Sequence, residues 1–170
     1  ARHPFIQELR TDEADDTRRG QRVRVSVVTA NYFDVLGVPP TRGRLFADAD
    51  DAGAASLVVL SHRYWSSRFQ ADESVVGSAL RLNGRVFTIT GVAAEGFHGT
   101  AVADADAWIP LSSTVATGLR DREALGNRRS GWLVVGARLR AGVTIDTAGA
   151  ELDVLARSLA REYADPTSQN

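Results

Sequence analysis

The chain has 170 residues, of which 44% are hydrophobic, and its formal net charge is −1 at pH 7. These values fit one sizeable globular domain or two small ones that share a core, and they argue against disorder and against a nucleic-acid partner, which would need a basic surface. Cysteine is absent, which excludes disulfides, thiolate metal sites and a cysteine nucleophile.

The first 20 residues are polar and charged, and they predict one short helix in "PFIQELR", residues 4–10, followed by a loop. No signal peptide is visible among them, and no apolar run in the chain approaches the ~20 residues of a membrane span. Because the sequence begins without Met, we expect it to be a piece of a longer protein.

A strand and a short helix are predicted over residues 22–37. The segment "RVRVSVV", residues 22–28, alternates polar residues with Val, which is typical of a strand with one solvent-exposed face. In "NYFDVLG", Asn31 and Asp34 stand at the spacing of a capping box, and Gly37 is the usual left-handed stop. The two prolines that follow prevent the helix from continuing.

The same arrangement recurs with an apolar strand in residues 57–60, Ser61 as the helix cap and an aromatic helix after it. The Asn-Gly pair at residues 83–84 lies between two alternating segments, which is the strongest local signal for a β-hairpin with a type I′ turn. A further strand is predicted in "AWIPL", residues 107–111.

The last part of the chain predicts a strand at residues 132–139 and then the longest helix, from Thr144 to about Tyr163. Apolar residues recur along this helix at spacings of three and four, so one stripe should pack inward. Its members are Ile145, Ala148, Leu152, Leu155, Leu159 and Tyr163. We expect the stripe to dock along the strands at residues 22–28 and 133–140.

Residues that could carry chemistry are present, but they form no recognised catalytic pattern. Ser61 and His62 could belong to a Ser-His-Asp triad, yet adjacent helix residues point about 100° apart and no Gly-x-Ser-x-Gly elbow occurs. We interpret Ser61 as a cap and His62 as a surface residue. His98, in the glycine-flanked "GFHGT", has no predicted partner, and a Walker-type phosphate loop is impossible without Lys.

Two groups of aspartates could in principle form a site. The run at residues 48–51 resembles the start of a calcium loop, but the twelfth position, where a bidentate Glu belongs, is Val59. We interpret this run as a solvated turn. Asp104 and Asp106 are interpreted as exposed carboxylates at a strand edge, so no catalytic, cofactor-binding or metal-binding residue is predicted.

Five segments together carry a resemblance to a known family. They are "VTANYFDVLGVPPTRGRLFADADD", "LVVLSHRYWSSRF", "SVVGSALRLNGRVFTITGVAAEGFHGT", "DAWIPL" and "LVVGARLRAGVTIDTAGAELDVLARSLAREY". In order and spacing, from about Val23 to Tyr163, they resemble the MacB-type periplasmic core domain of bacterial ABC transporter permeases, in the FtsX/MacB-like group. "GFHGT" and "DAWIPL" look most like the large permeases that lack a fused ATPase.

This resemblance implies an α+β fold of two subdomains. A porter-like subdomain would comprise residues 1–74 and 128–170, and a mostly β subdomain, residues 75–127, would be inserted between its halves. The domain would lie in the periplasm, anchored to the cytoplasmic membrane by transmembrane helices absent from this sequence. The implied partners are those helices, a second permease copy as a dimer, a cytoplasmic ATP-binding subunit and a periplasmic adaptor.

Three functions follow as hypotheses. The leading one is an extracytoplasmic permease domain, with no catalytic activity or cofactor of its own, that couples ATP-driven motion of the membrane helices to export or to work on an external substrate. The alternative is a passive substrate- or lipoprotein-binding module, with Phe97, His98 and Trp108 as partner-contact residues. The third is a hydrolase that uses Ser61 or His98.

Overall fold

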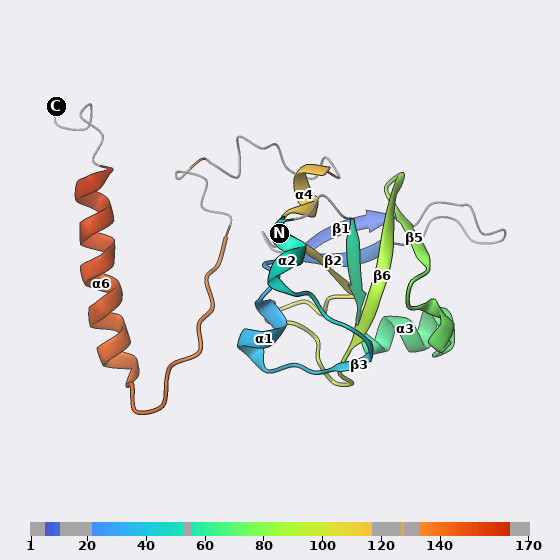
Figure 1. The fold of residues 1–170 in the computed structure, drawn as a ribbon, viewed down its shortest axis with the longest axis horizontal. Helices are drawn as coiled ribbons and strands as arrows, with labels where there is room; N and C mark the ends of the chain where they lie inside the picture. Colours follow the sequence, from blue (N-terminus) through green and yellow to red (C-terminus); the bar gives the residue numbers. More distant parts are fainter. Residues whose placement is uncertain (1–5, 11–21, 53–55, 117–126, 128–132, 164–170) are drawn as a thin grey trace. The chain divides into compact units, whose positions relative to one another are not determined.

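The computed structural model describes residues 6–10, 22–52, 56–116, 127 and 133–163 (Figure 1). The chain divides into two compact units, residues 1–134 and residues 135–170. Within the described residues, the first unit contains the sheet and the short helices, and the second unit contains one long helix.

The first unit is organised around a mixed sheet of seven described strands, in the order β1-β2-β7-β4-β6-β3, with β5 paired to β6. The strands are β1 (Ile6–Arg10), β2 (Arg22–Val28), β3 (Pro40–Gly43), β4 (Leu57–Leu60), β5 (Ala79–Leu82), β6 (Arg85–Ala93) and β7 (Ala107–Pro110). Two pairs are parallel, β2 with β7 and β4 with β6, and the other four are antiparallel. Helices combined with a mixed sheet confirm the predicted α+β class.

Strands from the two ranges expected for the subdomains pair within one sheet. β5, β6 and β7 lie in the range expected for the inserted subdomain, residues 75–127, yet β6 and β7 pair with β2, β3 and β4 from the range expected for the porter-like one. Two parallel strands need a long crossover connection between them. Strands from the early and the late part of the first unit therefore alternate in one sheet. The two compact units divide between residues 134 and 135, and the expected subdomains, residues 1–74 with 128–170 and residues 75–127, stay a proposal.

Short helices connect the strands of the first unit. They are α1 (Tyr32–Leu36), α2 (Asp48–Ala52), α3 (His62–Phe69), a 3₁₀ helix (Glu73–Val75) and α4 (Ser113–Ala116). α1 ends at Gly37, whose φ of 69° is the predicted left-handed stop. The capping box predicted at Asn31 is wrong: its side chain caps no helical N–H, and its Oδ1 accepts the Thr29 hydroxyl at 2.7 Å instead.

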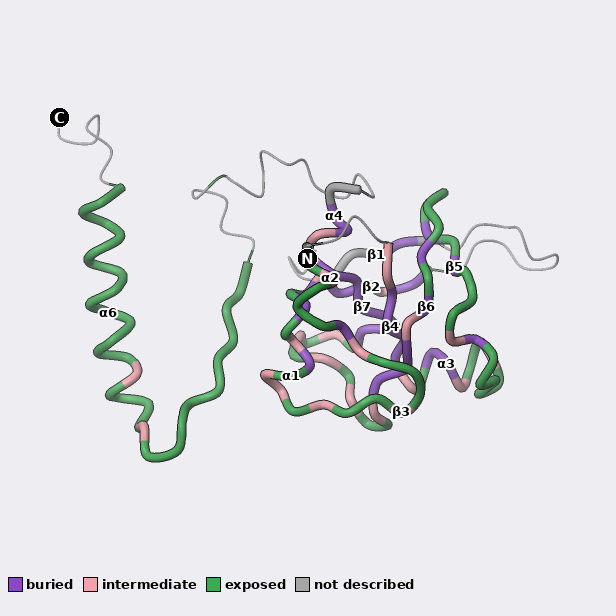
Figure 2. The backbone as a smooth tube through the Cα atoms, viewed as in Figure 1, coloured by how far each residue is buried: buried purple, intermediate pink, exposed green. Residues whose placement is uncertain are grey.

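Apolar side chains are buried on both faces of the sheet, and Figure 2 shows the buried segments concentrated in its central strands. Neighbouring residues of a strand point to opposite faces, and in β4 they belong to different core clusters, Val58 and Leu60 to one and Val59 to the other. α3 adds Trp65 to the first cluster, and α1 adds Phe33 to the second. Each buried apolar Å² stabilises the fold by roughly 25 cal/mol, so helices are held on both faces.

The hairpin predicted at Asn83 and Gly84 is present between β5 and β6. Leu82 pairs with Arg85, and the two turn residues take positive φ values of 50° and 78°. This backbone agrees with the type I′ turn that the Asn-Gly sequence favours.

The segment predicted as a helix at residues 4–10 is a strand from Ile6 onward, so that prediction is wrong. Leu9 is buried and stands opposite Val23 in the antiparallel β1–β2 pair. A short isolated helix is marginal in water, so pairing with β2 and burial of Leu9 outweigh the helix propensity of this segment.

The second unit contains α6 (Ile145–Glu162), which Thr144 caps by accepting the Thr147 N–H at 3.2 Å. No residue of α6 is buried, and Leu155 is 54% exposed. Within its own unit the stripe expected to pack inward therefore has no packing partner, since the described part of this unit holds no second helix or strand.

The strand predicted at residues 132–139 is also wrong where it can be judged. Residue 132 lies outside the described residues, and residues 133–139 form neither helix nor strand. Alternating apolar residues are not sufficient for a strand, because its backbone groups need a hydrogen-bonded neighbour. No such pairing is formed by this segment in the described part of the chain.

Candidate functional site

Phe97 and His98 lie in the loop between β6 and β7, and Trp108 is the second residue of β7. Trp108 is fully buried, Phe97 is partly buried, and the His98 side chain is 54% exposed. Trp108 was predicted to contact a partner, but it supports Phe97 from the interior. Of the three residues, Phe97 and His98 reach the surface.

Phe97 belongs to an aromatic cluster that joins α1 to β7 and consists of Tyr32, Phe33, Phe46, Phe97 and Trp108. The Phe97 ring is stacked on Trp108, with centroids 5.3 Å and planes 30° apart. Phe33 contacts Trp108 edge-on at 5.5 Å and Phe97 at 5.9 Å. Such pairs contribute about 0.5–1.5 kcal/mol each beyond their buried area, so the cluster holds the loop against α1 and β7.

The two polar atoms of this cluster differ in their hydrogen bonding. The Tyr32 hydroxyl accepts the Thr100 N–H at 3.1 Å and lies 3.2 Å from the Thr100 hydroxyl oxygen. The Trp108 indole N–H is buried and has no hydrogen-bond partner among the described residues. Gly99 lies beside it, because a Cβ built on Gly99 would be 3.5 Å from Trp108 Nε1 and 3.7 Å from the Tyr32 hydroxyl. A buried donor without an acceptor costs about 1–3 kcal/mol.

His98 has an acidic neighbour in Asp104, whose Oδ2 lies 4.0 Å from His98 Nδ1. That distance is too long for a hydrogen bond, and both side chains are about half exposed. The backbone is held more firmly, since the His98 carbonyl accepts the Ala105 N–H at 3.1 Å. The pair is a weak surface contact between two residues of the same loop.

Ser61 and His62 take structural positions at the start of α3. Ser61 is buried, and its Oγ accepts the Tyr64 N–H at 3.1 Å, which confirms the predicted cap. The His62 ring packs edge-on against Trp65 with centroids 5.4 Å apart. The hydroxyl is therefore engaged in capping the helix and is not presented to solvent.

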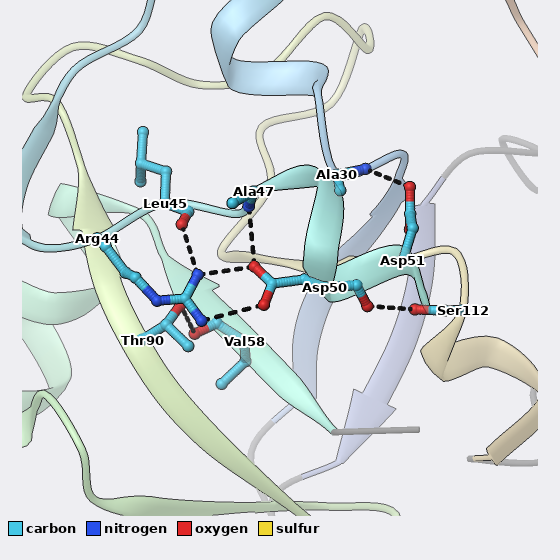
Figure 3. Close-up of polar contacts among 9 residues, drawn as sticks. All are labelled: Ala30, Arg44, Leu45, Ala47, Asp50, Asp51, Val58, Thr90 and Ser112. Carbon is cyan, nitrogen blue, oxygen red and sulfur yellow. Dashed lines mark hydrogen bonds and ion pairs between the residues drawn. The ribbon is translucent and has the colours of Figure 1, made fainter. Parts of the chain in front are cut away.

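The aspartate run forms α2, so its interpretation as a solvated turn is wrong (Figure 3). Asp50 binds the Arg44 guanidinium at 2.7 and 3.0 Å and accepts the Ala47 N–H at 2.8 Å. Asp51 accepts the Ala30 N–H at 2.9 Å. The hydrogen bond with Arg44 lowers the pKa of Asp50 and raises the pKa of Arg44. No group of three His, Cys, Asp or Glu side chains that could hold a metal occurs in the described part of the chain.

Asp106 has a structural role that the sequence analysis missed. It is only 7% exposed, although it was interpreted as an exposed carboxylate. Its Oδ1 accepts Arg63 Nη2 at 2.6 Å, and its Oδ2 accepts the Arg24 N–H at 2.9 Å. A buried carboxylate needs such partners, and these two lie on α3 and β2. The residues next to Asp106 in sequence give no sign of this pairing.

A family model of the MacB-like periplasmic core domain matches residues 3–155. Among solved structures, the chain is similar to the periplasmic region of MacB from Actinobacillus actinomycetemcomitans, with a TM-score of 0.60 and 20% identity over 91% of this chain and 68% of that one. It is similar to a domain of a protein described as a permease from Porphyromonas gingivalis, with a TM-score of 0.62 and 18% identity over 97% and 70% of the two chains.

A third similar structure is the extracellular domain of the ABC-type transporter YknZ from Gram-positive bacteria, with a TM-score of 0.55 and 15% identity. That match covers 69% of this chain and 57% of the YknZ domain. A comparison with curated proteins gives no significant match. Among the helices that the structure describes, none combines the length and the apolar character needed to cross a bilayer.

Proposed function

Since the chain belongs to the family of MacB-like periplasmic core domains, we propose that it is the extracytoplasmic part of an ABC transporter permease and couples ATP-driven motion of the membrane helices to export or to other work on an external substrate. The observation that carries this proposal is the continuous family match over residues 3–155, which includes every described strand. A Walker-type nucleotide site needs Lys, which these 170 residues lack, so the proposal places ATP hydrolysis outside this domain, in a nucleotide-binding subunit.

In this proposal the domain lies at the periplasmic face of the cytoplasmic membrane. Its partners are the transmembrane helices of the permease, a second permease copy, a cytoplasmic ATP-binding subunit and a periplasmic adaptor. The transporter names of the MacB and YknZ structures support this setting. The substrate and the direction of transport do not enter the proposal.

The first unit has the packing that a moving rigid body needs. Its sheet is buried on both faces, and polar contacts link elements that are distant in sequence, such as Asp106 with Arg24 and Arg63. Interiors packed at this density transmit strain with little internal deformation. The sheet of the first unit is therefore proposed as the transmitting body.

The location is tested by cysteine labelling in the full-length permease. The domain has no cysteine, so Arg81→Cys, at an exposed position of β5, adds one labelling site to it once other cysteines of the permease are removed. We expect a membrane-impermeant maleimide to label this cysteine in intact spheroplasts. A cysteine in the ATP-binding subunit is the control and should react only after permeabilisation. Labelling of Arg81→Cys only after permeabilisation would contradict the proposal.

The passive binding module is a second candidate, and one observation favours it. The unpaired N–H of Trp108 lies next to a surface loop, where a ligand could supply the missing acceptor. A purely passive module would bind its ligand but would not move with the nucleotide state of the ATP-binding subunit.

A further inference from the structure

The indole N–H of Trp108 raises a question that the proposed coupling does not answer. Trp108 Nε1 and the Tyr64 hydroxyl are the buried side-chain polar atoms that have no hydrogen-bond partner among the described residues. Native structures pair nearly all such atoms, so an exception calls for a ligand, a water molecule or a functional reason. Trp108 is the one next to a surface loop that carries another aromatic ring, Phe97.

The Phe97 ring covers one face of the Trp108 indole, the position that a bound aromatic ligand would take. Its ring is stacked on the indole at 5.3 Å and meets the edge of Phe33 at 5.9 Å. Phe33 and Trp108 are fully buried, whereas Phe97 is partly exposed. Phe97 is therefore the outer member of the three, and its departure would uncover the other two without disturbing the sheet below them.

The loop has a glycine on each side of the Phe97-His98 pair. Gly96 and Gly99 have φ values of +79° and +92°, a region that glycine occupies without strain. The loop is tied down by hydrogen bonds from the Phe97 N–H to the Ala94 carbonyl, from the Ala105 N–H to the His98 carbonyl and from the Thr100 N–H to the Tyr32 hydroxyl. These bonds do not belong to the sheet ladder, so rotation at the two glycines can move the ring while every strand stays paired.

We propose that the Phe97 side chain is an exchangeable plug, and that its withdrawal opens a binding site for an aromatic side chain of a partner protein, formed by Tyr32, Phe33 and Trp108. The partner's ring would take the place of the Phe97 ring. The indole N–H can only donate, so the ligand must carry an acceptor beside its ring, and the backbone carbonyl of a peptide supplies one. The site does not depend on coupling to ATP hydrolysis.

Charge around the loop favours an uncharged ligand over an anionic one. Glu95 and Asp104 flank the loop, and both are exposed. An exposed carboxylate of the ligand would be repelled by them, whereas a neutral peptide segment would not. The occupant is therefore an internal aromatic residue of a partner chain and not a free aromatic acid.

The test uses N-acetyl-phenylalanine amide, which reproduces the Phe97 ring and its two flanking amides without charge. Binding is followed on the three indole N–H resonances of the chain, with Trp108→Phe used for assignment. We expect the probe to shift the Trp108 resonance and to bind Phe97→Ala roughly tenfold more tightly than the unmodified chain, because one stacked ring no longer competes. Phe69→Ala is the matched control, since Phe69 is a partly buried Phe packed against the other core cluster.

Two further measurements separate an exchangeable plug from a simple cavity. In the unmodified chain, the Trp108 indole N–H should exchange with D₂O faster than the backbone N–H groups of β4. N-acetyl-alanine amide, which lacks the ring, should shift no indole resonance. If Phe97→Ala does not fold, Phe97→Leu replaces it, and its affinity for the probe should still exceed that of the unmodified chain.

The proposal is overturned by equal probe affinity of the Phe97 variant and Phe69→Ala, or by the absence of a probe-dependent shift of Trp108. It is equally overturned if the Trp108 indole N–H of the unmodified chain exchanges with D₂O no faster than the backbone N–H groups of β4. In that case Phe97 is a permanent part of the core. None of these results bears on whether the domain moves with the nucleotide state, so the two proposals fail independently.

Discussion

Gly91 of β6 is the position at which an added methyl group should be most damaging. A Cβ there would lie 2.3 Å from the Arg44 carbonyl oxygen and 2.7 Å from the Arg42 carbonyl oxygen. Gly91 also pairs with Gly43 of β3 and with Val59 of β4. The colliding atoms are backbone atoms held by paired strands, so no side-chain rotation can relieve the contact.

Overpacking in a well-packed core costs typically about 1–3 kcal/mol. Because the contacts at Gly91 involve backbone on both sides, we expect Gly91→Ala to cost about 3 kcal/mol, the upper end of that range. In a chain of this size 1 kcal/mol corresponds to a change in Tm of about 2–4 °C, so the Tm should fall by about 6–12 °C. Urea unfolding followed by circular dichroism gives the free energy, and calorimetry gives the Tm.

Gly149→Ala in α6 is the matched control, since a Cβ there meets no atom within 4 Å. It lies inside a helix, where Ala is favoured over Gly by about 0.5–1 kcal/mol, so it should leave the fold unchanged or stabilise it. If Gly91→Ala were as stable as the unmodified chain, β3 could not approach β6 as closely as the structure has it, and the packing argument would be refuted.

Gly84→Val should lower the free energy of unfolding in urea by about 1–3 kcal/mol, because the residue must keep a φ of 78°. An unchanged midpoint of the urea transition would contradict the turn. Asp106→Ala should cost about 2 kcal/mol, since the Arg24 N–H and the Arg63 guanidinium lose their acceptor, and Asp104→Ala, half exposed, is its control. The lowered pKa of Asp50 stabilises the fold above about pH 4, and that contribution is lost as the pH falls through the lowered pKa. In Asp50→Asn, the free energy of unfolding should therefore fall less steeply with decreasing pH than in the unmodified chain. The difference should be less than about 1 kcal/mol, because the Arg44 side chain is half exposed.

Three features encoded in a few adjacent residues could be predicted from the sequence, although the capping box at Asn31 could not. The Asn83-Gly84 turn, the Ser61 cap and the stop at Gly37 each depend on the backbone preference or hydrogen-bonding capacity of one or two residues. Those local signals act over one helical turn or one hairpin. They therefore held without any knowledge of how the strands are arranged.

Features that depend on distant pairing could not be predicted. Ile6–Arg10 is a strand because β2 is beside it, and Asp106 is buried because Arg24, 82 residues away, lies next to it. The Phe97 loop could be proposed as a candidate because "GFHGT" places His98 beside an aromatic residue in a glycine-flanked segment. The burial of Trp108 could not be foreseen, since the strand that contains it is covered by α1, which lies far away in sequence.

Motion of the domain with the nucleotide state of a permease can be measured as a change in the distance between two copies. In the full-length transporter in nanodiscs, spin labels at Arg81→Cys report the separation of the two domains by pulsed electron paramagnetic resonance. A label pair at Asp34→Cys and Arg81→Cys within one copy, both at exposed positions, is the control for internal rigidity. We predict an inter-copy distance that differs between the ATP-bound and nucleotide-free states and an internal distance that does not. An inter-copy distance that is the same in both states, in a transporter that hydrolyses ATP, would contradict it.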